Sequence, residues 1–331
     1  MWRGSIKIMN FSIIGVAGYV APRHLNAIYN LRHRLVAAVD PNDSVGLLDS
    51  YGFDIAFFTE IERFERHMDK LRHNEENRIH YVSICSPNYL HDSHIRMAIR
   101  GGANVICEKP LVINPWNIDR LSELAQESQQ AINVVLQLRV HPLLIELRQK
   151  VQATETIHDV VLTYITARGR WYDFSWKGDK SKSGGVAINI GIHFFDMLIW
   201  MFGAVQSFKV HLAEDRRMAG YIELERARVS WYLSIEASDL PFAVVPGKRS
   251  TYRSITIDGE DVEFTDGFTD LHTLIYQDVL NGNGFSVDDI RPATELTYGI
   301  RTAELSPIDE TAHVLLRNPD LLKEQFNKGI L

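Results

Sequence analysis

The chain has 331 residues, of which 45% are hydrophobic and 23% charged, and its formal net charge is −7. This length exceeds one typical core and predicts two domains of an ordinary globular protein. The acidic balance argues against nucleic acid or an anionic membrane surface as the main partner, although a local cluster of Arg and Lys could still hold an anionic small ligand.

The sequence lacks recognisable targeting signals, and its two cysteines are typical of an intracellular protein. No apolar run approaches the roughly 18 residues that a membrane span requires, and Met1–Asn10 lacks the apolar core of a signal peptide, so we expect a cytoplasmic protein. Cys85 and Cys107 both lie inside apolar, strand-like runs. This placement predicts buried, reduced thiols, with no disulfide framework and no metal site.

The first predicted elements have the layout of a dinucleotide-binding unit. A short apolar strand ends at Gly15, a glycine-rich turn follows with Ala17 in the middle glycine position and Gly18 after it, and a helix of about ten residues comes next. The second strand ends at Asp40, where a carboxylate can accept hydrogen bonds from both ribose hydroxyls and would repel a 2′-phosphate. The pattern favours NAD over NADP.

The chain then continues as alternating strands and helices. Asn42 and Ser44 lie in a turn that could cap a short helix or reach the adenosine end of the cofactor. The further predicted elements are a strand at 57–59, a charged amphipathic helix at 60–78, a buried strand at 81–85, a helix at 91–100, a strand ending at 107 and, after another helix, a strand at 134–138.

The strand that ends at Cys107 is followed by Glu108, Lys109 and Pro110. Proline fixes its own φ and pushes Lys109 toward an extended conformation, so a stiff backbone aims the amine. A solvated lysine at a strand end is the plain alternative. The position of this carboxylate and amine at the end of a buried strand favours chemistry in a cleft.

Six short apolar strands alternating with helices predict a doubly wound, parallel Rossmann sheet over residues 1–140. Ligands bind beyond the carboxyl ends of such strands. The candidate residues at those ends are Gly15, Asp40, Ser86, Glu108 and Arg139.

Residues 141–331 change to a pattern that predicts an α+β domain with a large, open, mostly antiparallel sheet. Alternating apolar and polar residues mark strands at 160–166, 208–212, 227–235 and 254–257, and Asp258–Gly259 is a hairpin turn. A sheet with one open face either binds a ligand or is covered by another subunit. We expect a homo-oligomer.

Two segments of this second domain carry candidate chemistry. A loop that mixes aromatic and basic residues contains Arg168, Trp176 and Lys177, and is either a ligand-facing loop or a basic surface loop. A following helix has Asn189, His193 and Asp196 four and three residues apart, hence on one face. A buried core histidine is the plain alternative, but an aspartate that orients the ring makes His193 a candidate general base.

Taken together, these motifs resemble the Gfo/Idh/MocA oxidoreductases over nearly the whole chain. The likeness rests on the glycine-rich turn, the sequence Ser-Pro-Asn-x-x-His at 86–91, Glu-Lys-Pro at 108–110 and the later helix with His193 and Asp196. Stretches at 15–24, 40–46, 81–91, 251–257 and 267–272 are similar to one branch of that family, the WlbA/WbpB type of UDP-N-acetyl-2-amino-2-deoxy-glucuronate 3-dehydrogenase.

The resemblance implies NAD-dependent oxidation of the 3-hydroxyl of UDP-GlcNAcA to the 3-keto sugar in bacterial lipopolysaccharide and O-antigen synthesis. It also implies a homotetramer packed through the C-terminal sheets, with 2-oxoglutarate as a candidate oxidant of NADH. Implied cofactor contacts are Gly15, Ala17, Gly18, Tyr19, Val20, Asp40, Asn42, Ser44, Ser86, Pro87, Asn88, His91, Glu108, Lys109, Gln137 and Trp176. Implied substrate contacts are Lys109, Arg139, Arg168, Lys177, Asn189, His193, Tyr252 and Arg253.

The implied catalytic residues are Lys109, His193, Asn189 and Asp196. Many family members have Asp where this chain has Asn189, so a Lys-Asp-His scheme does not carry over whole. Either Lys109 or His193 could accept the hydroxyl proton, and we favour His193. Two alternatives remain from the sequence: a dehydrogenase of another sugar, inositol or nucleotide sugar, and a non-catalytic NAD-binding regulator.

Overall fold

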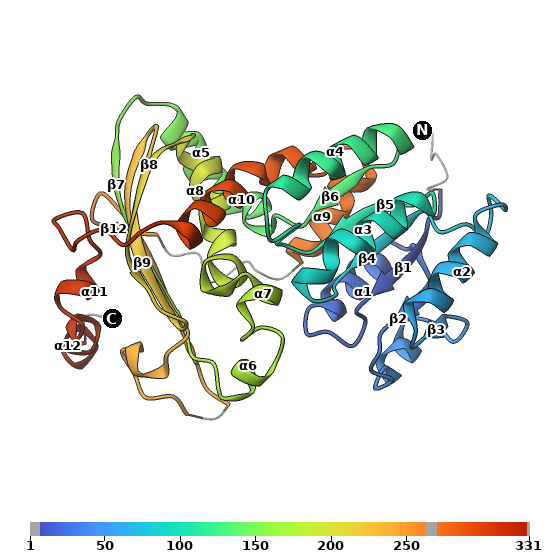
Figure 1. The fold of residues 1–331 in the computed structure, drawn as a ribbon, viewed down its shortest axis with the longest axis horizontal. Helices are drawn as coiled ribbons and strands as arrows, with labels where there is room; N and C mark the ends of the chain where they lie inside the picture. Colours follow the sequence, from blue (N-terminus) through green and yellow to red (C-terminus); the bar gives the residue numbers. More distant parts are fainter. Residues whose placement is uncertain (1–6, 246, 263–269, 330–331) are drawn as a thin grey trace, which may run out of the picture. The chain divides into compact units, whose positions relative to one another are not determined.

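The computed structural model describes residues 7–245, 247–262 and 270–329. The chain forms two compact units (Figure 1). Unit 1 comprises Met1–Val140 and Thr269–Arg291, and unit 2 comprises His141–Phe268 and Pro292–Leu331. Unit 1 is first interrupted after Val140, near the expected domain boundary. A later segment, Thr269–Arg291, returns to unit 1.

The described part of unit 1 contains a six-stranded sheet in which every pairing is parallel, in the order β3-β2-β1-β4-β5-β6. Its strands are β1 (Asn10–Ile14), β2 (Arg34–Val39), β3 (Ala56–Phe58), β4 (Tyr81–Ile84), β5 (Asn104–Cys107) and β6 (Ile132–Val134). Strand order reverses between β1 and β4, which is where a doubly wound sheet binds its ligand. The predicted Rossmann fold is confirmed.

Helices cover both faces of this sheet: α1 (Ala21–Asn30), α2 (Ile61–Leu71), α3 (His91–Arg100), α4 (Trp116–Ser128) and α9 (Leu271–Leu280). α1 packs against α9, and α3 packs against α4. Because parallel crossovers are right-handed, α1 lies on one face and α2, α3 and α4 lie on the other. The returning helix α9 therefore shares the face of α1.

Two predicted boundaries in unit 1 are wrong. The helix expected at 60–78 ends at Leu71, because the side chain of Asn74 accepts hydrogen bonds from the backbone N–H groups of Glu76 and Asn77 and forms a turn. The strand expected at 134–138 ends at Val134, and Gln137–Val140 forms a 3-10 turn instead.

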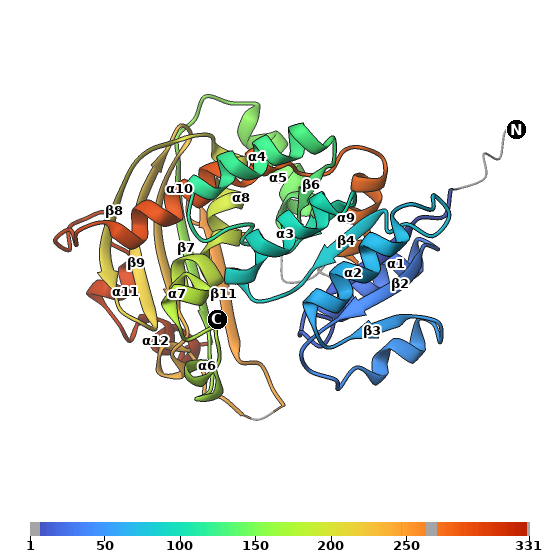
Figure 2. The ribbon, with the colours of Figure 1, turned by 45° about the vertical axis from the view of Figure 1, so that its right-hand side comes forward.

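Unit 2 contains a six-stranded mixed sheet in the order β12-β11-β7-β10-β9-β8, in which only β7 and β10 pair in parallel among the described strands (Figures 1 and 2). The strands are β7 (His158–Thr166), β8 (Val205–Ala213), β9 (Arg217–Leu224), β10 (Ala227–Ser234), β11 (Thr251–Ile257) and β12 (Glu260–Asp261). The predicted antiparallel character is confirmed. Asp258 and Gly259 both have positive φ and form the predicted hairpin turn. The prediction missed β9.

The helices of unit 2 are α5 (Pro142–Gln152), α6 (Trp171–Phe174), α7 (Lys180–Ser183), α8 (Ile192–Phe202), α11 (Val314–Arg317) and α12 (Leu321–Asn327). α10 (Val287–Thr302) contains the boundary between the units at Pro292. The helical segment Lys180–Phe202 is long and apolar enough to cross a membrane, contrary to the expectation from the sequence. It is 72% buried in its most apolar window, as the core helix of a globular unit is. Phe195 of α8 packs edge-on against the buried Trp231 of β10.

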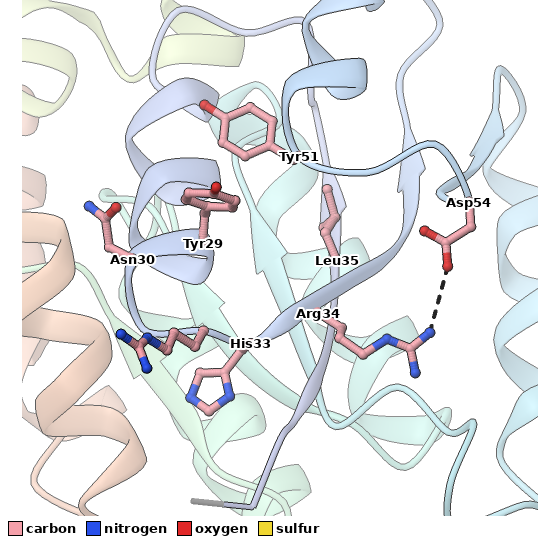
Figure 3. Close-up of a pocket in the computed structure, with 8 residues that line it drawn as sticks. Tyr29, Asn30, His33, Arg34, Leu35, Tyr51 and Asp54 are labelled. Carbon is pink, nitrogen blue, oxygen red and sulfur yellow. Dashed lines mark ion pairs between the residues drawn. The ribbon is translucent and has the colours of Figure 1, made fainter.

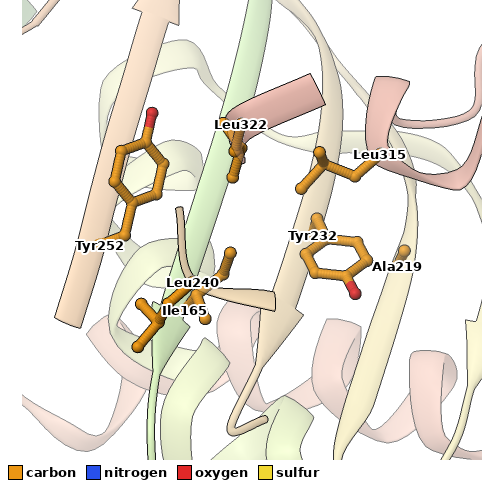
Figure 4. Close-up of a cluster of buried hydrophobic side chains, with 7 residues drawn as sticks. All are labelled: Ile165, Ala219, Tyr232, Leu240, Tyr252, Leu315 and Leu322. Atoms are coloured by element: carbon orange, nitrogen blue, oxygen red, sulfur yellow. The ribbon is translucent and has the colours of Figure 1, made fainter. Parts of the chain in front are cut away.

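The other face of this sheet is not simply open. Figure 1 shows the sheet nearly edge-on, with α8 on one side and α11 and α12 on the other. Figure 4 shows the resulting cluster, in which Leu315 and Leu322 cover side chains from four strands and from the loop at Leu240. The cluster consists of Ile165, Ala219, Tyr232, Leu240, Tyr252, Leu315 and Leu322. The chain therefore covers part of the face that we expected another subunit to cover.

Candidate active site

The turn after β1 can accept a pyrophosphate. Gly15 has a φ of +85°, and a Cβ there would lie 2.7 Å from the backbone between Cys85 and Ser86. Only glycine permits this approach of the β1 and β4 loops. No side chain caps the N-terminus of α1 in the described chain, and the positive end of the helix dipole there favours an anion. Among the other expected cofactor contacts, Ala17 and Gly18 are half-buried, as is Val20, and Tyr19 is exposed.

Asp40 follows β2 and already accepts two backbone hydrogen bonds. The N–H of Ala17 donates to Oδ2 at 3.0 Å, and the N–H of Asn42 donates to Oδ1 at 2.9 Å. A carboxylate has about four acceptor sites, so each oxygen can still accept a ribose hydroxyl. Asn42 accepts the N–H of Ser44 in a local turn, and the 3-10 helix at Gly46–Ser50 has no side-chain cap, so the expected capping role is wrong.

The loop after β4 is built from buried polar groups. Ser86 hydrogen-bonds to His94 at 2.9 Å, and burial lowers the pKa of His94 to about 4. Both ring nitrogens of the buried His91 face backbone carbonyl oxygens, of Pro110 at 2.7 Å and of Ser86 at 2.8 Å. His91 thus joins the loops after β4 and β5 and does not present its ring to a ligand. Pro87 is half-buried and Asn88 is buried in the same loop.

Glu108 follows β5 and is buried among two histidines. Its Oε1 lies 3.0 Å from Nε2 of His24 on α1 and 3.0 Å from Nε2 of His272 on α9. Burial would raise the pKa of Glu108, but these two hydrogen bonds outweigh that effect and hold the pKa well below its usual value. Glu108 is therefore an anion. The adjacent Lys109 is half-buried, and the Lys109–Pro110 peptide bond is cis.

His24, Glu108 and His272 are also of a composition that can bind a metal ion. However, ligand atoms about 2.1 Å from a tetrahedral ion lie roughly 3.4 Å from one another, whereas both histidines lie at hydrogen-bond distance from one oxygen. The geometry fits a hydrogen-bonded cluster. Neither histidine was among the predicted site residues.

Arg139 does not behave as expected for a substrate contact. Its guanidinium donates to the Oδ1 of Asp289 at 3.1 Å and to the Asp289 carbonyl at 2.8 Å, and it lies over the ring of Phe285. The ion pair holds the returning segment of unit 1. This expectation is therefore corrected: Arg139 binds the chain's own carboxylate. Gln137 is half-buried in the preceding 3-10 turn.

In unit 2, the candidate helix begins with an irregular turn. Ala187–Gly191 is a π-helical turn, a feature frequent at functional sites, and α8 follows it. Asn189 in this turn donates to the hydroxyl of the buried Tyr172 at 2.9 Å. His193 is half-buried in the first turn of α8, and Asp196, one turn later, is buried. Tyr172 was not among the predicted site residues.

The aromatic and basic loop is held by an arginine that was not among the predicted site residues. Arg216 pairs with Asp173, pairs with Glu236 at 2.6 Å and donates to the carbonyl of Arg168 at 2.9 Å. The amine of Lys177 lies 5.6 Å from the ring of Trp176. Burial and, to a smaller extent, the charge of Arg168 lower the pKa of Lys177.

Tyr252 and Arg253 are neighbours on β11 and face opposite sides of the sheet. Tyr252 is buried in the cluster of Figure 4, while the guanidinium of Arg253 lies 5.7 Å from the ring of Tyr164. The two side chains cannot both contact one ligand, and the packing of Tyr252 corrects its expected role as a substrate contact.

A pocket of about 510 Å³ in unit 1 is lined by none of these residues (Figure 3). Its lining includes Tyr29 near the end of α1 and Arg34 and Leu35 at the start of β2, with Asp54 ion-paired to Arg34. This is the amino end of the strands, opposite the edge at which such sheets bind ligands.

Comparison with known proteins identifies the fold. Residues 9–136 match the oxidoreductase family, NAD-binding Rossmann fold, and residues 155–307 match the C-terminal alpha/beta domain of the same family. The chain belongs to the Gfo/Idh/MocA oxidoreductase family. Its N-terminal unit is an NAD-binding domain, in agreement with the turn at Gly15 and the carboxylate of Asp40.

Several members of this family are similar to the chain. The WlbA (WbpB) dehydrogenase from Thermus thermophilus, solved with NAD and alpha-ketoglutarate, is 48% identical with a TM-score of 0.87 over 92% of this chain and 99% of that one. The same dehydrogenase with NAD and UDP-GlcNAcA is 47% identical with a TM-score of 0.88 over the same shares. D-glucoside 3-dehydrogenase of Escherichia coli (strain K12) is 30% identical over 137 residues, which span 39% of this chain and 38% of that enzyme.

Proposed function

We propose that this protein oxidises the 3-hydroxyl of UDP-GlcNAcA to the 3-keto sugar with NAD as hydride acceptor. The observation that carries the proposal is the 47% identity, over 92% of the chain, to a dehydrogenase solved with NAD and UDP-GlcNAcA. The residues needed for the chemistry are present: an amine follows β5 at Lys109, and His193 and Asp196 lie one turn apart on α8.

In this proposal NAD supplies the hydride acceptor, and the chain supplies orientation and proton transfer. Lys109 of unit 1 and His193 of unit 2 are the two groups that we propose to act on the sugar 3-hydroxyl. Lys109 donates a hydrogen bond to the hydroxyl oxygen, which fixes it for reaction, and His193 accepts the proton. Asp196 orients the histidine ring, and Asn189, held by Tyr172, lines the same helix turn. Positioned proton transfer contributes about 10²–10⁴-fold to such a rate.

The anionic groups of the substrate need cations. Arg168, whose backbone is anchored by Arg216, is our proposed partner of the uronate, because a guanidinium binds a carboxylate in two places. Lys177, half-buried beside Trp176, is the proposed diphosphate contact. Trp176 itself is proposed to border the cofactor.

We further propose that the enzyme is cytoplasmic, acts in bacterial surface-polysaccharide synthesis and forms a homo-oligomer, with a tetramer as the expected state. The part of the sheet face beyond the cluster of Figure 4 supports this association. It contains the half-buried Tyr221, Ser230 and Val161 side by side in register on β9, β10 and β7. NADH is proposed to be reoxidised by 2-oxoglutarate, as the ligand of the Thermus structure suggests.

The test is absorbance in the NADH band with purified protein, NAD and UDP-GlcNAcA, with and without 2-oxoglutarate, beside UDP-GlcNAc and myo-inositol. We expect NADH formation with the uronate alone, and 2-hydroxyglutarate once the oxo acid is added. Lys109→Ala should lose at least about 100-fold in kcat while NAD still binds. Turnover of inositol or UDP-GlcNAc in place of the uronate would show that the substrate is a different alcohol. NAD binding without any turnover would favour a non-catalytic regulator.

A further inference from the structure

A chain of buried hydrogen bonds in unit 1 ends on Glu108. The hydroxyl of Ser83 lies 2.5 Å from that of Tyr276, which lies 2.7 Å from Nδ1 of His24, whose Nε2 lies 3.0 Å from Oε1 of Glu108. His272 reaches the same oxygen at 3.0 Å. Tyr276 and His272 both come from α9, the helix that returns to unit 1 long after the sheet is complete.

The protons in this chain have only one consistent order. Glu108 is ionised and accepts, so both histidines donate from Nε2. Burial lowers the pKa of His24, which is therefore neutral with Nδ1 as an acceptor. Tyr276 must then donate to His24, and Ser83 must donate to Tyr276. Every donor in the chain points toward the carboxylate.

This hydrogen-bond network fixes the negative charge of Glu108 and does not conduct a proton to water. Ser83, at its far end, is fully buried on β4, and so are His24 and Tyr276. Glu108, at its near end, keeps 9% of its side chain exposed. The members of the network that reach solvent are therefore the anion itself, at the carboxyl end of β5, and His272, whose side chain is 6% exposed.

The position of Glu108 relates this anion to one half of the cofactor. Asp40 after β2 takes the adenosine ribose and the turn at Gly15 takes the pyrophosphate. The remaining half of the dinucleotide must extend to the other side of the switch point, over the ends of β4 and β5. Glu108 follows the last residue of β5 on the same face of the sheet as Ser83 of β4.

We propose that His24, His272 and Tyr276 are positioning residues that hold Glu108 as a fixed anion beside the nicotinamide half of the cofactor, so that the protein discriminates in favour of oxidised NAD⁺ over NADH. The oxidised ring carries a positive charge that the reduced ring lacks, and a nearby anion in a partly desolvated site stabilises only the oxidised form. The proposal rests on NAD as the cofactor and is independent of the sugar substrate.

Other titratable groups face the same carboxylate, and burial favours the neutral form of three of them. Burial raises the pKa of the Cys85 and Cys107 thiols, which remain neutral, and burial lowers the pKa of His91 on α3. Lys109 follows Glu108 in the chain and carries the opposite charge.

Isothermal titration of NAD⁺ and of NADH, without sugar, at pH 6, 7.5 and 9 tests the proposal. Glu108→Gln keeps the volume and should raise the Kd of NAD⁺ about tenfold, with the Kd of NADH changed less than about twofold. Tyr276→Phe keeps the ring that stacks on Phe11 but removes the hydroxyl that donates to Nδ1 of His24. This nitrogen can then take up a proton at low pH, and the resulting His24 cation offsets the charge of Glu108. Its NAD⁺ preference should be normal at pH 9 and decline toward the Glu108→Gln value at pH 6.

The matched control is Tyr51→Phe, which removes an exposed tyrosine hydrogen bond to Asn26 in the same unit, outside the network that ends on Glu108. It should leave both dissociation constants unchanged. Equal changes in the NAD⁺ and NADH constants of Glu108→Gln would show a merely structural carboxylate and overturn the proposal. A Tyr276→Phe protein with a normal, pH-independent preference would remove Tyr276 from the positioning set.

Discussion

Asp40 shows how one side chain can organise a loop and recognise a ligand together. Its two oxygens accept the N–H groups of Ala17 and Asn42, which fixes the glycine-rich turn against the loop after β2. The same carboxylate can still accept hydrogen bonds from the ribose hydroxyls, and its charge repels a 2′-phosphate. The negative charge of Asp40 contributes to holding the loop and to recognising the cofactor. Asparagine has the same shape without the charge, so Asp40→Asn tests what the charge contributes.

Asp40→Asn should therefore weaken NAD binding about tenfold, because a hydrogen bond to a charged acceptor is lost, and should weaken NADP binding less, because the repulsion is lost too. Quenching of tryptophan fluorescence by each cofactor measures both constants. Asp43→Asn, which changes an exposed carboxylate three residues away, is the control. An unchanged ratio of NAD to NADP affinity in Asp40→Asn would rule out Asp40 as the ribose partner.

At the scale of elements, the loop before α6 depends on Arg216 in the turn between β8 and β9. Its guanidinium contacts Asp173, Glu236 and the carbonyl of Arg168, so one side chain joins three segments of unit 2. Such bidentate and charge-assisted contacts are stronger than ordinary surface ion pairs. The loop that bears the proposed uronate partner is therefore placed by a residue that need not touch the substrate.

We expect Arg216→Ala to raise KM for UDP-GlcNAcA about tenfold with kcat changed less than about threefold, since binding in the ground and transition states is lost equally. Lys323→Ala, which breaks an exposed ion pair on α12, is the control. Steady-state kinetics at saturating NAD give both constants. A fall in kcat with KM unchanged would contradict a loop-placing role.

The segment around α11 is placed by His313. Its Nδ1 accepts the N–H of Leu315 at 3.2 Å, and its Nε2 faces the hydroxyl of Thr163 at 2.9 Å, an arrangement that suits the neutral ring. Burial, and then the charge of Arg317, lower the pKa of His313 to about 3. Because an unfolded histidine has a pKa near 6.5, acid favours the unfolded chain.

The stabilising contribution of His313 is thus fully present above about pH 6.5 and is lost as the pH falls toward 3, with about 2 kcal/mol lost by pH 5. His313→Asn keeps a cap acceptor but does not titrate. Its Tm should fall less between pH 7.5 and pH 5 than that of the unmodified protein, measured by circular dichroism, whereas exposed His73→Asn should match the unmodified protein. Equal pH dependence in all three would contradict this assignment.

Sequence patterns over a few neighbouring residues were enough to predict most strands and one turn. Apolar runs flanked by glycine or charge predicted the strands of unit 1, and Asp258–Gly259 predicted the hairpin between β11 and β12 in unit 2. β9 was missed because Gly220 interrupts its pattern. Glycine is required there because a Cβ would lie 2.2 Å from the carbonyl oxygen of Lys209 and 2.7 Å from the ring of Trp231. The contact between His24 and Tyr276 joins residues far apart in sequence, so spacing could not reveal it. The sequence located Asp40 and Glu108, but not what surrounds the buried carboxylate.

At the scale of the whole molecule, unit 1 is discontinuous. The sheet forms from the first 140 residues, yet α9 and the segment to Arg291 complete it. Arg139 and Asp289 join the two parts, with 9% and 37% of their side chains exposed, and Ser286 donates to the same carboxylate. This ion pair should be worth more than an exposed one, because breaking it leaves a half-desolvated charge.

Arg139→Ala should lower the free energy of unfolding by about 1–3 kcal/mol, and Asp289→Ala added to it should cost less than the sum of the two single changes. Urea denaturation followed by circular dichroism measures both, with Arg120→Ala, an exposed ion-pair partner on α4, as the control. Strict additivity of the two changes would show that the pair does not couple the segments.

The split of unit 1 also sets an order of events during synthesis. The last strand of the sheet leaves the ribosome with Val134, but His272 and Tyr276 follow about 140 residues later. At about 5–20 residues per second, translation needs roughly 7–30 s to supply them. During that interval Glu108 has one of its two histidine donors, and the face of the sheet that α9 will cover is exposed. The nascent Rossmann unit should therefore be a client of ribosome-bound chaperones until α9 emerges.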